Sequence, residues 1–204
     1  AVYSIASRSQ RTDVATLLLA GLAINALTAA GVGFFSYLGT DAQLRSLTFW
    51  LLGGLGGAIW GLIWPLLIVM GAAAGGLLCL RGSYDVLALG ESGAGHLGLD
   101  VEFVQRATIV CVALGAGASV ALTGIIGFVG LVAPHLVRLL GGSPSHRFVL
   151  PASALMGALL LVLADLLART MAAPAELPVG ILTSALGAPF FIALLCRSRA
   201  RPMP

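Results

Sequence analysis

Long uncharged stretches limit what this chain can fold into. Four of them run without any charged side chain: residues 14–38, 58–80, 107–134 and 177–196. At about 1.5 Å per residue, helices of this length cross the roughly 30 Å hydrocarbon core of a bilayer. Charged residues make up 9% of the chain, whereas a soluble domain carries about 25%. We therefore expect an all-α, polytopic membrane protein.

The longest of these stretches, 107–134, has 28 residues, which is long for one crossing and short for two. Its second half has glycines at 124, 127 and 130, before Pro134. On one helix beginning at 124, these glycines form a smooth ridge that lets a neighbouring backbone approach closely. A turn near Thr123 would allow the chain to cross the membrane twice here. Residues 148–164 form a further apolar stretch.

The distribution of arginines favours the double crossing. With two crossings in 107–134, nine arginines fall on one side of the membrane and two on the other. The side with nine carries Arg8, Arg11, Arg81, Arg106, Arg138, Arg147, Arg197, Arg199 and Arg201, and the other side carries Arg45 and Arg169. Cytoplasmic loops are enriched in positive charge. The sequence therefore predicts six transmembrane helices with both ends of the chain in the cytoplasm.

Three shorter features complete the predicted architecture. Residues 43–52 indicate a short helix that lies in the interface or is re-entrant, and GGLGG at 53–57 indicates a sharp turn. Gly71 and Gly75 form a GxxxG packing face. The polar segment 81–106 indicates two small amphipathic helices at the cytoplasmic surface. That segment either docks a soluble partner or is an ordinary surface loop.

The sequence contains no recognisable set of catalytic residues. The chain contains no lysine, so a Walker A phosphate loop is excluded. The histidines and cysteines show no ligand spacing, and we expect Cys79, Cys111 and Cys196 to be small buried side chains. We expect no catalytic residue, no cofactor, no metal site and no nucleic-acid partner.

Four polar residues lie within or next to the predicted spans: Asn25, Arg45, Asp165 and Arg169. Asp165 and Arg169 are spaced i, i+4, which favours an ion pair on one helix. Arg45 and Arg169 either anchor the chain at the interface or meet carboxylates of an external partner. Asn25 either forms a helix–helix hydrogen bond or faces a pore. With so few ionisable groups in the membrane, a stand-alone secondary transporter or channel is the weaker alternative.

Three long motifs carry a resemblance to a known family. GIIGFVGLVAPHLVRLLGG, HRFVLPASALMGALLLVLADLLART and APAELPVGILTSALGAPFF resemble the FecCD-type permeases of iron-chelate, haem and cobalamin ABC importers. LLLAGLAINAL resembles the fifth helix of that family, LALGESGAGHLG its cytoplasmic coupling segment, and DAQLRSLTFWLLGGLGGAIW its haem branch. The match extends over essentially the whole chain. It implies one permease domain, 1–204, that corresponds to helices five to ten of a ten-helix type II importer fold, without the first four.

The resemblance implies the permease subunit of an importer in the bacterial inner membrane that carries haem or another iron chelate from periplasm to cytoplasm. Ferric siderophore and cobalamin are the alternative cargoes. The implied partners are ABC ATPase subunits, a periplasmic binding protein, a second permease copy in a homodimer and membrane lipid. Within the coupling segment 81–106, the residues implied to contact the ATPase are Leu89, Gly90, Glu91, Ala94, Leu97 and Gly98. Arg169 is implied to dock the binding protein, and we expect Arg45 to join it, because both arginines lie on the outer side in the predicted topology. The residues implied to line the path are Asn25, Leu182, Leu186 and Pro189.

Overall fold

A computed structural model of the chain describes residues 14–141, 143–171 and 177–199, and these residues form helices with no strand among them. The chain divides into two compact units, Ala1–Thr48 and Phe49–Pro204. The first unit holds α2 (Val14–Leu38) and most of α3 (Asp41–Leu52). The side chain of Gln43 accepts a 2.9 Å hydrogen bond from the backbone N–H of Thr40. This Thr-x-x-Gln capping arrangement fixes the start of α3.

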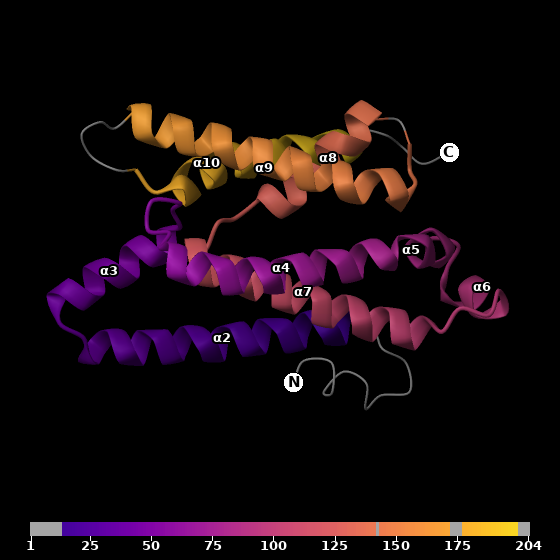
Figure 1. The fold of residues 1–204 in the computed structure, drawn as a ribbon, viewed down its shortest axis with the longest axis horizontal. Helices are drawn as coiled ribbons and strands as arrows, with labels where there is room; N and C mark the ends of the chain where they lie inside the picture. Colours follow the sequence, from indigo (N-terminus) through magenta and orange to yellow (C-terminus); the bar gives the residue numbers. More distant parts are fainter. Residues whose placement is uncertain (1–13, 142, 172–176, 200–204) are drawn as a thin grey trace. The chain divides into compact units, whose positions relative to one another are not determined.

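The second unit contains seven helices among its described residues, shown in Figure 1. They are α4 (Trp60–Cys79), α5 (Arg81–Leu87), α6 (Glu91–His96), α7 (Val101–Thr123), α8 (Val129–Gly141), α9 (His146–Met171) and α10 (Val179–Arg199). The predicted short helix before the GGLGG turn, the two small helices within 81–106 and the turn near Thr123 are all present. Pro178 directly precedes α10, where its missing N–H has no cost.

The helix α8 runs antiparallel to α9. A Cβ on Gly157 of α9 would touch Val129 and Ala133 from the first half of α8. Phe148, near the start of α9, lies against Gly141 at the end of α8. The chain therefore passes twice between the two ends of this unit across 107–134, although α8 has only 13 residues.

Small side chains bring these helices close together. The buried apolar residues of the second unit are all alanine or valine. Between α4 and α7, a Cβ on Gly115 would meet Ala73 at 3.4 Å, and Gly76 lies against the Cys111 sulfur. Within the described part of the second unit, the predicted Gly71–Gly75 face meets no other helix, because a Cβ at either position would meet nothing within 4 Å. The packed face of α4 is the one carrying Ala73 and Gly76.

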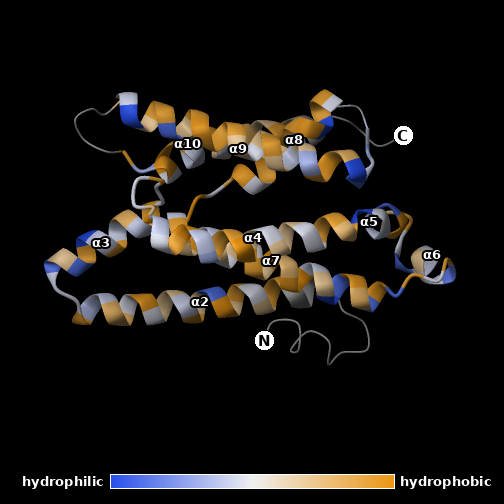
Figure 2. Cartoon of the chain, in the orientation of Figure 1, coloured by the Kyte–Doolittle hydropathy of each residue, from blue (hydrophilic) through white to orange (hydrophobic). Residues whose placement is uncertain are grey.

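Four helices are long and apolar enough to span a membrane: Leu18–Leu38, Trp60–Cys79, Val101–Thr123 and His146–Met171. The other two predicted spans are shorter apolar helices, Val129–Gly141 and Val179–Leu194. At most 11% of the residues in each long hydrophobic window are buried inside the chain. Figure 2 shows hydrophobic residues along the length of these helices, and many of their large apolar side chains are exposed. Such faces suit lipid or other membrane helices rather than water.

Two expectations about single residue types are wrong. The three glycines do not share a helix, because Gly124 ends α7 with a φ of 69° and Gly127 lies before α8. Only Gly130 of that set is helical, since the chain must turn between α7 and α8. Cys79 and Cys196 are exposed rather than buried. Arg8, Arg11 and Arg201 of the predicted charge pattern lie outside the described residues.

Candidate functional site

The segment 81–106 presents apolar side chains outside the predicted spans. The side chains of Leu89 and Leu97 are 70% and 67% exposed. The short helix α6 lies between two glycines with positive φ, Gly90 at 95° and Gly98 at 80°. These backbone conformations favour glycine because an L side chain at positive φ is strained against its own backbone. The segment is thus a folded element that holds two exposed leucines on either side of α6, as a protein-contact surface would require.

Hydrogen bonds and burial hold this segment against α7. Ala94 of α6 is fully buried. The Glu91 carboxylate accepts a 2.9 Å hydrogen bond from the side-chain amide of Gln105. Asp100 caps α7 by accepting a 3.0 Å hydrogen bond from the backbone N–H of Phe103. Of the six predicted ATPase-contact residues, Ala94 therefore supports the segment from inside, whereas Glu91 is exposed.

A polar cluster joins α5 to the start of α9, and we call it the Asp85 junction: Asp85, Ser145 and His146. The Asp85 carboxylate accepts hydrogen bonds from the backbone N–H of His146 at 2.7 Å and from the Ser145 hydroxyl at 2.9 Å. The His146 ring nitrogen Nδ1 lies 2.7 Å from the same carboxylate. The His146 backbone N–H, followed by its ring, lowers the pKa of Asp85 to about 2. An ionised carboxylate only accepts hydrogen bonds, so Nδ1 carries a hydrogen.

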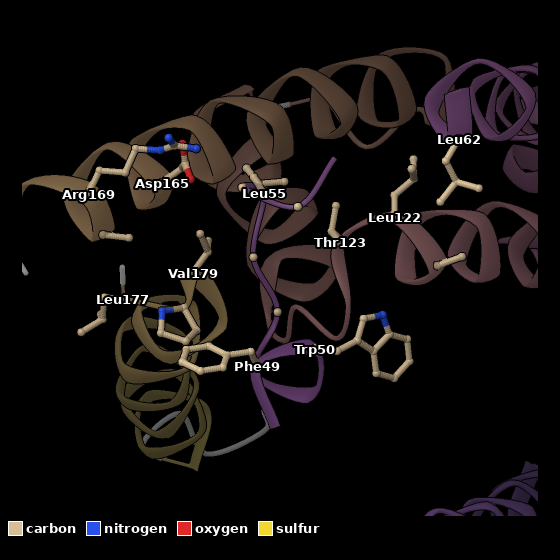
Figure 3. Close-up of a pocket in the computed structure, with 17 residues that line it drawn as sticks. Phe49, Trp50, Leu55, Leu62, Leu122, Thr123, Asp165, Arg169, Leu177 and Val179 are labelled. Carbon is tan, nitrogen blue, oxygen red and sulfur yellow. The ribbon is translucent and has the colours of Figure 1, made fainter. Parts of the chain in front are cut away.

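The opposite end of the second unit holds a pocket of about 400 Å³, shown in Figure 3. Its walls come from the end of α3, the glycine turn, the last turn of α7, the last turns of α9 and the start of α10. The lining residues are Phe49, Trp50, Gly53, Gly54, Leu55, Gly56, Gly57, Leu62, Ala121, Leu122, Thr123, Asp165, Ala168, Arg169, Leu177, Pro178 and Val179. Its lining side chains are apolar except for Thr123 and one ion pair, Asp165 with Arg169.

The ion pair consists of Arg169 and Asp165 on α9, as predicted from their spacing. The guanidinium Nε donates to the Asp165 carboxylate at 2.8 Å. The Arg169 side chain is 58% exposed and that of Asp165 is 23% exposed. A carboxylate from another protein could therefore reach Arg169 without first unfolding its surroundings, and Asp165 holds the guanidinium in place.

Backbone hydrogen bonds beside this pocket tie together chain segments that are not helical. The Gly54 N–H donates to the Thr123 carbonyl at 2.8 Å, and the Ile125 N–H donates to the Trp50 carbonyl at 3.3 Å. Non-helical backbone in a membrane protein must be satisfied within the protein, because lipid offers no hydrogen bonds. The glycine turn is satisfied by the end of α7, and the α7–α8 connection is satisfied by the end of α3.

The predicted path residues lie in both units. Asn25 is exposed on α2 and Pro189 is exposed within α10. Leu182 packs against the buried cluster of Ala164, Ala168 and Val179, whereas Leu186 is 63% exposed and lines a cavity of about 210 Å³ between α8, α9 and α10. Arg45 is exposed on α3 in the first unit. The described residues contain no group of three or more potential metal ligands.

Sequence reasoning missed the Asp85 junction, since it found no histidine paired with a carboxylate. The residues of this pair are 61 positions apart, so no local spacing reveals them. The sequence does contain a hint of the helix start, because Ser145 precedes the apolar run 148–164 at a position typical of an N-cap residue. It does not indicate the Asp85 carboxylate, which also caps α9 but belongs to α5.

Comparisons with known proteins agree with this geometry. The chain matches the FecCD transport family over residues 1–197. The hemin transport system permease protein HmuU of Yersinia pestis is 46% identical over 194 residues, which cover 95% of this chain and 58% of that protein. The vitamin B12 import system permease protein BtuC of Vibrio vulnificus is 44% identical over 193 residues, which cover 94% of this chain and 57% of that protein.

A solved structure has the same fold. It is described as an inward-facing conformation of a metal-chelate type ABC transporter, and it superposes with a TM-score of 0.86 at 31% sequence identity. The alignment covers 96% of this chain and 62% of that structure. The chain thus spans somewhat more than half the length of the proteins it resembles. Because the family match covers nearly all of its residues, the chain belongs to the FecCD transport family.

Proposed function

We propose that this chain is part of the membrane-spanning permease of an ATP-driven importer that moves haem or another iron chelate from periplasm to cytoplasm. The observation that carries the proposal is the 46% identity to a hemin permease over 95% of the chain. The exposed leucines of the segment 81–106 give the surface that such a permease needs for its ATPase. ATP hydrolysis takes place on that separate subunit, and this chain contributes no catalytic residue.

Cobalamin and ferric siderophore are the alternative cargoes. The vitamin B12 permease of Vibrio vulnificus is 44% identical to the chain, against 46% for the hemin permease. Sequence identity therefore favours haem over cobalamin as the cargo by a small margin. The binding protein selects the cargo before the permease meets it. A second permease copy completes the path, with Asn25 of α2 and Leu182, Leu186 and Pro189 of α10 at the predicted two-fold axis.

The test is uptake by the purified permease, reconstituted in proteoliposomes with its ATPase and its periplasmic binding protein. We expect ATP-dependent accumulation of haem that exceeds that of ferric siderophore and of cobalamin. Accumulation of cobalamin alone would reassign the cargo. Uptake without ATP or the ATPase would instead support a stand-alone transporter or channel, and would contradict the proposed function.

The proposed docking of the binding protein through Arg169 has its own test. Charge reversal by Arg169→Glu should weaken binding-protein affinity roughly tenfold, because it replaces attraction for a partner carboxylate by repulsion. Surface plasmon resonance on the permease in nanodiscs measures this affinity, with expression level and monodispersity as checks of insertion. Arg147→Glu is the matched control, since Arg147 is exposed at the other end of the same helix. Equal affinities for all three proteins would exclude Arg169 from docking.

A further inference from the structure

The Asp85 junction connects the segment 81–106 to a long helix and has no role in the contacts proposed so far. Its acceptor lies on α5, directly before the exposed part of that segment. Its donors are Ser145 and His146 at the start of α9, a helix of 26 residues that carries the Arg169–Asp165 ion pair near its other end. In Figure 1, α5 and the start of α9 lie at the same end of the second unit. One helix therefore links the two predicted partner surfaces.

The start of α9 depends on this contact for hydrogen bonds. The first N–H groups of a helix have no acceptor within it. The Ser145 hydroxyl accepts from the Arg147 N–H at 3.3 Å and also donates to Asp85, while the His146 N–H goes to Asp85 itself. The N–H groups of Phe148 and Val149 bond to the Ser145 carbonyl. Ser145 thus caps the following N–H groups, and the carboxylate of α5 supplies the acceptor for the His146 N–H and holds the Ser145 hydroxyl.

On the α5 side of the junction, Tyr84 makes further contacts with α9 and α7. The Tyr84 ring lies 5.8 Å from the His146 ring. The Tyr84 hydroxyl is hydrogen bonded to the Thr108 hydroxyl of α7 at 2.8 Å. Because three helices meet through directed bonds at this point, α5 cannot move away from α9 without breaking several of them.

We propose that Asp85 is a positioning residue for transport, whose carboxylate fastens the start of α9 to α5 so that displacement of the segment 81–106 moves α9. The inference rests on the proposed function, in which an ATPase displaces that segment. Asp85 touches neither the cargo nor the reacting phosphates. Its role is to keep ATP hydrolysis on one side connected to the helix that carries Arg169 on the other.

The experiment measures cargo moved per ATP hydrolysed, with the permease, its ATPase and its binding protein in proteoliposomes. Asp85→Ala should lower this ratio roughly tenfold, within the range typical of coupling between sites, while ATP hydrolysis continues. His146→Ala removes only the ring contact and keeps the bonds from the His146 backbone and the Ser145 hydroxyl, so it should lower the ratio less. The double variant should be no worse than Asp85→Ala, because that change already removes every contact to the carboxylate. Asp85→Asn keeps the side-chain size and should lower the ratio less.

Asp100→Asn is the matched control, because Asp100 lies in the same segment but caps its own helix, and asparagine caps as well. Its ratio of cargo moved per ATP hydrolysed should equal that of the wild type.

Two results would overturn the inference: an Asp85→Ala protein with the wild-type ratio, or one in which uptake and ATP hydrolysis fall in the same proportion. If Asp85→Ala does not assemble, the same criteria apply to Asp85→Asn. Absence of ATP-dependent uptake in the wild type would refute the proposed function instead.

Discussion

Gly124 and Gly180 lie where three chain segments come within backbone contact. A Cβ on Gly124 would overlap the Trp50 carbonyl, and a Cβ on Gly180 would overlap the Leu52 carbonyl. Gly124 also has φ 69° and ψ −163°, a region that is essentially restricted to glycine. At these two positions the end of α7 and the start of α10 therefore both pack against the backbone at the end of α3.

Replacing Gly124 by alanine should destabilise the permease by at least about 1–3 kcal/mol, the typical cost of such backbone strain alone. Thermal unfolding in detergent, followed by size-exclusion chromatography, measures the effect. Gly117→Ala is the control, since a Cβ there meets nothing within 4 Å inside α7, and alanine favours the helix. A Gly124→Ala protein as stable as Gly117→Ala would show that the three segments are not in close contact.

At the scale of single residues, prediction succeeded for local pairs. The Asp165–Arg169 pair follows from helix spacing. The Asp85–His146 pair and the contact at Gly180 do not, because each joins elements far apart in sequence. Which glycine needs its missing Cβ also depends on what packs against it, as Gly71 and Gly76 of α4 demonstrate.

Between α7 and α8, the chain is strained as well as non-helical. Phe128 has a positive φ of 66°, the only such non-glycine among the described residues. Its side chain lies over Gly187 of α10, where a Cβ would overlap it, and its ring is 6.3 Å from that of Phe191. Strain of this kind persists only where the surrounding packing fixes it. The sequence indicated a turn near Thr123, but not this contact.

A double-mutant cycle tests the contact between Phe128 and α10. Gly187→Ala should cost about 1–3 kcal/mol through overpacking. In a Phe128→Gly background the same change should cost much less, because the overlapping side chain is gone and glycine accepts the positive φ. Thermal unfolding of the four proteins gives the interaction energy. Gly75→Ala, which meets nothing within 4 Å, should cost the same in both backgrounds, and additive effects at Gly187 would contradict the contact.

At the scale of the whole molecule, composition and uncharged stretches sufficed to predict an all-helical membrane protein, and the motifs identified its family. The helix ends around 124–128 were not predictable, because a glycine-rich apolar run fits a helix and an unwound crossing equally well. In the second unit, Arg81 and Arg147 lie at the ends of α5 and α9 that meet at the Asp85 junction, whereas Arg169 lies at the far end of α9. This separation agrees with the predicted charge asymmetry.

Cysteine labelling tests the proposed orientation. In a permease with Cys79, Cys111 and Cys196 replaced by alanine, Thr40→Cys should react with a membrane-impermeant maleimide on intact spheroplasts, because it precedes α3 on the predicted periplasmic side. Ser92→Cys in α6 should react only after permeabilisation. Both positions are exposed, so reactivity reports the side of the membrane. The reverse pattern would place the arginine-rich side outside, against the rule that favours positive charge in the cytoplasm, and would put the segment 81–106 out of reach of an ATPase.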